Sequence, residues 1–211
     1  MARRSPSKAP AEPRSRSRVE RRGSKVPTGE ARRPVQIHNG CRRLRFNRRE
    51  VAAAIHLLDA HASEILGSAH AGHRPPALGR RPPSFDPRRL TVLRLPPGEL
   101  SLAFLTDSAL AALHDRFLGD AAATDVITFG GNPALGKAGE ICVSVDAARV
   151  YARRHGRDFS GELTLYVVHG WLHLAGHDDL NPRAKRRMRS AERRAMNLLH
   201  AAGAAPRFSP A

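Results

Sequence analysis

The chain has 211 residues, of which 41% are hydrophobic, so it can build one core of ordinary domain size but not obviously two. Its 36 Lys and Arg residues exceed its 19 Asp and Glu residues by a formal charge of +17, a balance typical of proteins that bind a polyanion such as RNA, although surface solvation alone is the alternative. No apolar run reaches the length of a membrane span or secretory signal, and Cys41 and Cys142 are too few for a disulfide framework. We therefore expect a cytoplasmic protein with no membrane partner and with free thiols.

Composition divides the chain into a domain and its appendages. Residues 1–33 hold eleven basic and three acidic residues with almost no large apolar side chain, so this basic tail cannot form a core. The tail is either an RNA-contacting arm or a dispensable solvated extension. We expect the domain at residues 34–202, with a Pro- and Arg-rich insertion at residues 67–89, and a C-terminal tail at residues 203–211.

Two short strand patterns open the domain, at residues 35–38 and 44–46. The turn residues Asn39 and Gly40 lie between them. The two pieces are therefore either a hairpin or separate strands.

A helix is predicted to follow, because Asn47 and Glu50 are spaced as a capping box. Its apolar face has six members at helical spacing: Val51, Ala54, Ile55, Leu58, Ala62 and Ile65. His56 and His61 fall off this face, and we expect both to face solvent.

β-rich runs predict four more strands, at residues 90–95, 100–105, 124–129 and 140–145. Thr106 or Asp107 is expected to cap a helix that runs to about Phe117. Asp146 is expected to cap another helix, which ends at Gly156.

Residues 160–176 are predicted to form a buried helix, because their apolar side chains surround the helix rather than forming one stripe. Ser160 is the expected N-cap, and Gly176 is the expected end. His169 and His173 are four residues apart, so both imidazoles project from one side of this helix. A bound cation would replace the hydration that these two side chains lose on burial.

The chain then offers His177, Asp178 and Asp179, one of which can complete a set of three protein ligands and leave a fourth position for water. The alternative is that His169 and His173 are ordinary histidines at a chance spacing. Zinc proteases carry glutamate directly after the first histidine, where this chain has glycine, which argues against peptide hydrolysis.

Residues 169–179 read HGWLHLAGHDD and resemble the H-G-x-L-H-L-x-G-[YH]-D-H signature of the YbeY family, bacterial endoribonucleases and ribosomal RNA maturation factors. Three further elements are similar to the family's second strand, its T-[DN]-V-L-S-F strand and its G-[DE]-I element: residues 99–105, 124–129 and 139–141. The resemblance covers about residues 35–201 and excludes the basic tail and the insertion.

The resemblance implies a metal-dependent endoribonuclease, specific for single strands, that acts in ribosomal RNA maturation, including the 3′ end of the small-subunit RNA, and in ribosome quality control. Its implied partners are RNA and the small ribosomal subunit. The alternatives are a non-catalytic ribosome-assembly factor with a structural zinc, and a zinc hydrolase of small or peptide substrates. We expect an α+β fold: a single domain whose mixed sheet of about four strands packs against about five helices, with the metal site on a buried helix.

The chain departs from the family pattern at two positions. The family's third ligand is usually histidine where this chain has Asp179, but carboxylate oxygen also binds zinc. We therefore expect one Zn²⁺ on His169, His173 and Asp179, with His177 as the reserve ligand. The family's arginine before its T-[DN]-V strand corresponds to Leu118, so no catalytic residue is carried over.

The last helix is predicted to begin after Asn181 and Pro182. One side carries its apolar residues: Ala184, Met188, Ala191, Ala195 and Leu198. The basic residues that we expect to contact RNA phosphates lie largely elsewhere: Arg183, Arg186, Arg187, Arg193 and Arg194. The alternative for this basic face is a solvated helix surface.

Overall fold

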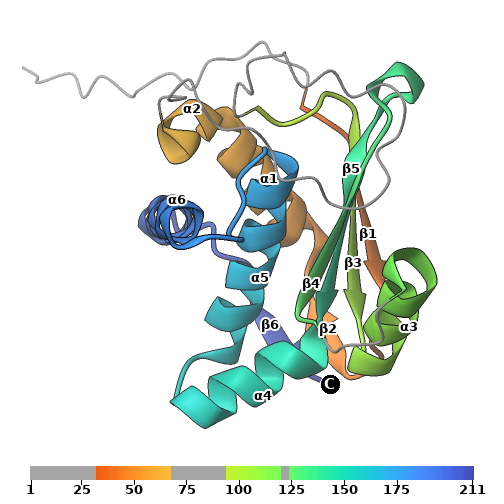
Figure 1. Ribbon diagram of the computed structural model, residues 1–211. Helices are drawn as coiled ribbons and strands as arrows, with labels where there is room; N and C mark the ends of the chain where they lie inside the picture. Colours follow the sequence, from red (N-terminus) through yellow and green to blue (C-terminus); the bar gives the residue numbers. More distant parts are fainter. Residues whose placement is uncertain (1–31, 68–93, 120–123) are drawn as a thin grey trace, which may run out of the picture. The chain divides into compact units, whose positions relative to one another are not determined.

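A mixed sheet forms the centre of the computed structural model, which describes residues 32–67, 94–119 and 124–211 (Figure 1). Its strands, in spatial order, are β1 (Val35–Asn39), β3 (Glu99–Leu105), β5 (Lys137–Ser144) and β4 (Val126–Gly130). The first three are parallel, and β4 runs antiparallel to β5 at the edge. The expected mixed sheet of four strands is confirmed.

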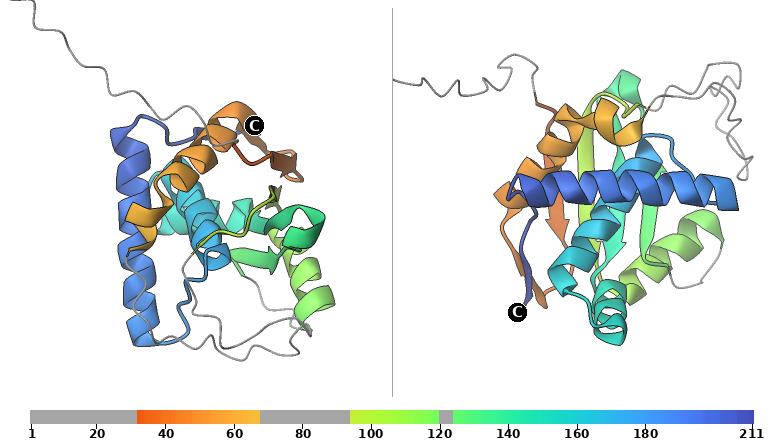
Figure 2. Two further views of the ribbon diagram at one scale, coloured as in Figure 1. Left: turned by 90° about the horizontal axis from the view of Figure 1, so that it is seen from above. Right: turned by 90° about the vertical axis from the view of Figure 1, so that its left-hand side faces the viewer.

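Helices cover both faces of this sheet. The helices of the described residues are α1 (Arg48–Ala60), α2 (Ala62–Leu66), α3 (Asp107–Leu118), α4 (Val145–His155), α5 (Phe159–Leu174) and α6 (Pro182–Ala201), with a short 3₁₀ turn η1 (Pro133–Leu135). Figures 1 and 2 show α5 between the sheet and α6, with α3 on the opposite face. Because α5 meets protein on opposite sides, apolar residues surround it, as the sequence predicts.

The alternation of side chains along the strands builds two cores. Leu100, Leu102 and Phe104 of β3 point into the main core, which α1, α5 and α6 complete. Ala103 and Leu105 point the other way, into a smaller core beneath α3. The buried helix α5 therefore belongs to the larger of the two cores.

The first two strand patterns are not a hairpin. β1 pairs with β3, whereas β2 (Leu44–Phe46) pairs with β6 (Phe208–Pro210) in a separate antiparallel ribbon. Phe46, Phe104 and Phe208 hold this ribbon against the sheet, with ring centroids 4.7 to 5.7 Å apart. Residues 203–211, expected as a tail, thus contain a strand. The sequence did not reveal this strand, because its single aromatic residue is too weak a signal to predict a pairing across about 160 residues of chain.

The first helix also differs from its prediction. It breaks at His61, which separates α1 from α2. His56 and His61 are half-buried rather than solvent-facing: Nε2 of His56 lies 3.0 Å from the carbonyl of Arg33, and Nδ1 of His61 lies 3.3 Å from Glu64.

Two N-caps lie two residues before their predicted positions. Asp158, not Ser160, accepts the capping hydrogen bond of α5, and Ser144, not Asp146, caps α4. The Ser160 hydroxyl instead donates to the carbonyl of Pro206 at 3.0 Å. Several Ser and Asp side chains near the start of a helix can each serve as the N-cap, and the sequence does not distinguish them. The backbone conformation decides which side-chain oxygen accepts the capping hydrogen bond.

The remaining elements follow their predictions closely. Thr106 caps α3, Gly156 ends α4, and Asn181 caps α6, although Leu199 rather than Leu198 completes the buried side of α6. Cys41 and Cys142 are buried and unpaired. Of the strand expected at residues 90–95, only Arg94 and Leu95 are described, and neither is in a strand.

The basic tail up to residue 31 and the insertion from residue 68 lie outside the described residues. Arg33, which composition places in the tail, belongs to the folded unit: its guanidinium is 2.7 Å from Asp59 and also donates to the carbonyl of Pro96. Among the described helices, none combines the length and apolar composition that a membrane span needs.

Candidate metal centre

His169 and His173 project from the last two turns of α5 with their Nε2 atoms facing each other, 3.0 Å apart. Their rings stand edge to face, with an interplanar angle of 86°. Nδ1 of His169 lies 2.7 Å from Oε1 of Glu192, and Nδ1 of His173 lies 3.1 Å from the main-chain oxygen of His177. A carboxylate or carbonyl oxygen only accepts, so each Nδ1 donates and both neutral Nε2 lone pairs point at the same spot.

The end of α5 determines what lies beside these histidines. Ala175 is the C-cap, and the N–H groups of Gly176 and His177 donate to the carbonyls of His173 and Leu172. This Schellman pattern requires a left-handed residue at position 176, where glycine has a φ of 95°. The turn directs the carbonyl of His177 back to His173 and leads the chain on to Asp179.

Asp179 completes the cluster, with Oδ1 3.9 Å from Nε2 of His173. One ligand atom from each of His169, His173 and Asp179 lies within 4.8 Å of the other two. The side chains are 23%, 27% and 36% exposed in that order, so solvent reaches one side of the cluster. Two imidazole nitrogens and a carboxylate oxygen are a donor set that zinc prefers, and the residues present therefore fit such an ion.

The pKa values of the two histidines shift in opposite directions because their partners differ. Burial acts to lower the pKa of His169, but the hydrogen bond and charge of Glu192 outweigh it and raise that pKa. Burial lowers the pKa of His173, and the neighbouring His169 lowers it further. The lone pair of His173 is consequently the more available of the two.

His177, the reserve ligand, lies outside the cluster formed by the other three candidates. Its side chain is buried, and its Nε2 has no hydrogen-bond partner in the described part of the chain. Burial lowers the pKa of His177 to about 4, with Arg194 and Arg187 adding to the effect. What His177 offers the centre is its carbonyl oxygen, which holds the ring of His173.

Gly170 occupies the position where a zinc protease would carry its glutamate. A Cβ there would lie 2.4 Å from Cγ2 of Ile141 and 3.2 Å from a methyl group of Val126. Position 170 therefore faces the sheet rather than the metal centre, and packing leaves no room for any side chain. The packing against Ile141 gives the structural reason why this position is glycine and not the glutamate of a zinc protease.

Glu192 is a residue of the site that the sequence prediction missed. It is the only acidic residue of α6, in a stretch otherwise rich in arginine. A single acid among many arginines was the one feature of the sequence that could have indicated a role for Glu192. Its partner, His169, is 23 residues away on another helix, so helical spacing could not connect them.

The arginines predicted to bind RNA are placed differently from one another. Arg183, Arg186, Arg187 and Arg193 are exposed on α6. Arg194 is exposed as well, but it donates from two nitrogens to the carbonyl of Ile65, at 2.8 and 2.6 Å, which satisfies the C-terminal end of α2. Arg116, two residues before the family's arginine position, lies exposed with its guanidinium 5.5 Å from the ring centroid of Phe117.

Known proteins resemble the chain over this region. The family model of endoribonuclease YbeY matches residues 89–200, slightly more than half of the chain. An endoribonuclease YbeY of Myxococcus xanthus is 36% identical over 49% of this chain and 37% of its own length, and one of Chlamydia pneumoniae is 35% identical over 52% and 75%. One of Koribacter versatilis is 40% identical over 38% of this chain and 53% of its own length.

A solution structure from Thermotoga maritima aligns with 81% of this chain and 94% of that one, at 16% identity and a TM-score of 0.45, a likeness too loose to place any side chain. The matched region of the family model contains α5, its two histidines, Asp179 and Glu192. The chain belongs to the endoribonuclease YbeY family.

Proposed function

We propose that this chain is a metal-dependent endoribonuclease that cuts single-stranded RNA during ribosomal RNA maturation, including at the 3′ end of the small-subunit RNA, and in ribosome quality control. The observation that carries the proposal is the pair of Nε2 atoms 3.0 Å apart, each ring being held by a partner at Nδ1. Membership in a family described as endoribonuclease YbeY supports the reaction. The proposed setting is the cytoplasm, with the small ribosomal subunit as partner.

His169, His173 and Asp179 would hold one zinc ion, which supplies a Lewis acid that polarises a phosphoryl oxygen or a water molecule. Glu192 orients His169, and the His177 carbonyl orients His173. The side chains of the three ligands are 23 to 36% exposed, so a substrate can approach them from solvent.

Exposed arginines suit the proposed substrate. Arg183, Arg186 and Arg187 stand on the first turns of α6, a short stretch of chain after Asp179. Each can neutralise a phosphate, and the resulting binding weakens as salt rises. Arg193, which is exposed farther along α6, belongs to the same proposed set. Arg194 is left out because its guanidinium is engaged by the carbonyl of Ile65.

A ribosome-assembly factor with a structural zinc is the second candidate. Structural zinc sites normally have four protein ligands, whereas the cluster in the described residues has three and is open to solvent. These features favour catalysis.

The test combines metal analysis with cleavage of a single-stranded RNA on one preparation. The full chain, its metal-stripped form, His173→Ala and the control His200→Ala are compared; His200 is an exposed histidine at the end of α6. We expect one zinc per chain, with cleavage by the wild type and His200→Ala alone and RNA binding by all four. Undiminished cleavage by His173→Ala would contradict the proposal, and binding without cleavage by any form would favour the assembly factor.

A further inference from the structure

A cavity of about 440 Å³ lies where α3, α4 and α5 meet. Its volume is within the range of about 300 to 1,000 Å³ found for sites that bind small organic groups. Six of its lining residues carry the argument: Asp107, Asp125, Val150, Tyr151, Arg154 and Tyr166. None of them takes part in the candidate metal centre.

Tyr166 contributes a firmly packed side chain to the lining of the cavity. The residue as a whole is only 7% exposed. Because Tyr166 lines the cavity, its hydroxyl is available to a molecule bound there.

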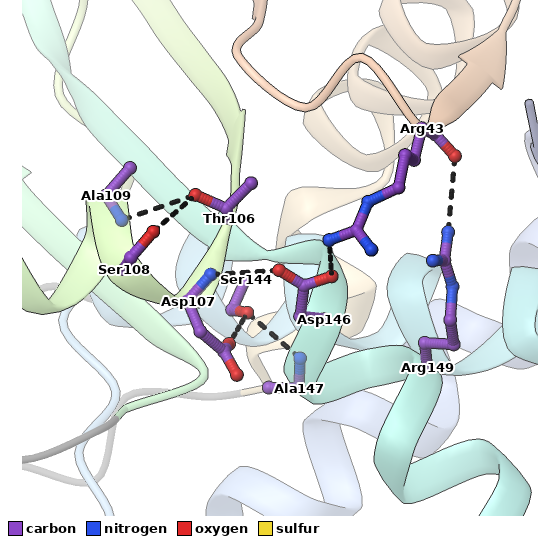
Figure 3. Close-up of polar contacts among 9 residues, drawn as sticks. All are labelled: Arg43, Thr106, Asp107, Ser108, Ala109, Ser144, Asp146, Ala147 and Arg149. Atoms are coloured by element: carbon purple, nitrogen blue, oxygen red, sulfur yellow. Dashed lines mark hydrogen bonds and ion pairs between the residues drawn. The ribbon is translucent and has the colours of Figure 1, made fainter.

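Asp107 lines this cavity. Figure 3 shows the polar contacts that hold it. The hydroxyl of Ser144 donates to Oδ1 of Asp107, and the main-chain N–H of Asp107 donates to Oδ2 of Asp146 at 3.2 Å. The same Ser144 oxygen accepts from the N–H of Ala147 at 3.0 Å. These contacts hold the carboxylate of Asp107 at the end of β5 and its main chain at the start of α4, so its position is fixed before a ligand binds.

Asp125 provides the second carboxylate. Its main-chain oxygen accepts a hydrogen bond from Ser144 at 2.8 Å, which anchors it, while its side chain is exposed and makes no hydrogen bond to the described residues. Two carboxylates in one cavity repel phosphate, in contrast to the chain's overall charge of +17. The cavity therefore suits a group that donates N–H bonds.

The opposite wall suits a flat ring. Val150 is 57% exposed and Tyr151 38% exposed, although both are apolar or aromatic. The ring of Tyr151 stacks on His155 with a centroid distance of 4.0 Å, and the guanidinium carbon of Arg157 lies 5.7 Å from the Tyr151 centroid, so a base that stacks on this ring must displace the flexible Arg157 side chain. An exposed, supported aromatic ring next to hydrogen-bond acceptors is the usual arrangement for an unpaired nucleobase.

We propose that this cavity is a nucleobase subsite that selects a guanine of single-stranded RNA next to the metal centre. Guanine presents two adjacent N–H donors on its Watson–Crick edge, which one carboxylate can accept together. Arg154, at the rim, is exposed and suits the adjoining phosphate. This inference rests on the proposed function, since it names the preferred sequence of that substrate.

The position of the cavity agrees with this role. Tyr166 lies one helical turn before His169 on α5. Asp125 directly precedes Val126, and a methyl group of Val126 packs against Gly170, the residue after His169. A base held in the cavity thus leaves a neighbouring phosphate near the metal centre.

The test compares a short oligouridine RNA that carries one guanosine with the same RNA carrying inosine, which lacks only the 2-amino group. Binding to the full chain is followed by fluorescence anisotropy, with RNA integrity checked on a gel after each titration, and cleavage of both RNAs is measured in parallel. We expect the RNA with guanosine to bind about tenfold more tightly than the RNA with inosine, because a bidentate contact to a base typically contributes a difference of this size. Asp125→Asn and Tyr166→Phe should bring the ratio close to one, whereas Asp115→Asn, an exposed aspartate on α3, should leave it unchanged.

Thermal melting of each variant checks that it folds, and Tyr166→Phe keeps the buried ring. An equal affinity for both RNAs, or a preference that both cavity variants retain, would overturn the subsite. Cleavage of both RNAs without a guanine preference would support the proposed function and contradict the subsite. A guanine preference in binding without cleavage would support the subsite and contradict the proposed function. N-acetylarginine amide tests the alternative that the cavity binds a basic protein side chain. That alternative would hold if this compound competed with RNA for the wild type but not for Asp125→Asn, and if neither RNA were preferred.

Discussion

The carboxylate of Glu192 accepts a hydrogen bond from Nδ1 of His169 at 2.7 Å and so joins the amphipathic helix α6 to the buried helix α5. The side chain of Glu192 is 18% exposed, which makes this a sheltered, charge-assisted contact. It places the Nε2 lone pair of His169 opposite that of His173. Through this contact the orientation of a metal ligand depends on how two helices pack.

Replacing Glu192 by glutamine should weaken zinc retention about tenfold, since partners that orient a ligand typically contribute about 10- to 100-fold to metal affinity. Competition with a chromogenic chelator measures the change. Glu64→Gln is the matched control, because Glu64 is 74% exposed and lies on α2, away from the cluster. Equal zinc affinity of Glu192→Gln and Glu64→Gln would show that Glu192 does not orient the ligand.

Asp179→Ala should weaken zinc retention more than His177→Ala. Asp179 brings a carboxylate oxygen into the cluster, whereas the carbonyl that His177 contributes belongs to the main chain and survives the substitution. The same chelator competition compares the two variants with the wild type. The opposite order would make His177 the third ligand.

Gly170→Ala should destabilise the fold by about 1 to 3 kcal/mol, the usual cost of overpacking. The added methyl group would lie 2.4 Å from Ile141, and helix and sheet must separate to admit it. Gly161→Ala, on the same helix, is the control: its Cβ would come no closer than 3.4 Å to Asp158, so alanine should be neutral or stabilising. Urea unfolding measures both, and equal stabilities would refute the close helix packing.

Arg33→Ala should cost about 3 kcal/mol, because it leaves the sheltered carboxylate of Asp59 without its cation. Asp59 also accepts the indole N–H of Trp171 at 3.0 Å, so the loss reaches the metal-site helix. Arg32→Ala, at an exposed neighbouring position, should have little effect on the free energy of unfolding.

A truncated chain that begins at Arg32 should have the same melting temperature as the full chain, and one that begins at Pro34 should have a lower melting temperature.

The stability of the metal-free protein should fall in acid partly because of His177. Its pKa drops from an ordinary value of 6.5 to about 4 on folding, so its contribution is fully present above pH 6.5 and is lost as the pH falls towards 4. A difference of this size corresponds to about 3 kcal/mol. Urea melts across this pH range should show a shallower fall for His177→Gln than for the control His200→Gln.

Local patterns in the sequence were sufficient for most elements and for the first half of the site. All-round apolar character identified α5, and a four-residue spacing placed His169 and His173 on one side of it. Asp179 followed from the glycine turn and the family signature, and the structure brings it to the two histidines. Each of these placements depends on residues that are near one another in the chain.

Contacts between distant segments required the tertiary structure. Glu192 reaches His169 from another helix, Arg33 meets Asp59, and β6 returns to pair with β2. Position 170 must be glycine because Ile141 of the sheet occupies the space that a side chain would need, and not because of the conformation of the helix. Residue spacing was enough to show which groups could bind a metal ion, because spacing along a helix sets direction. The orientation of those groups depends on the packing of α6 and the sheet against α5, because hydrogen-bond partners and steric limits come from segments that are far apart in the chain.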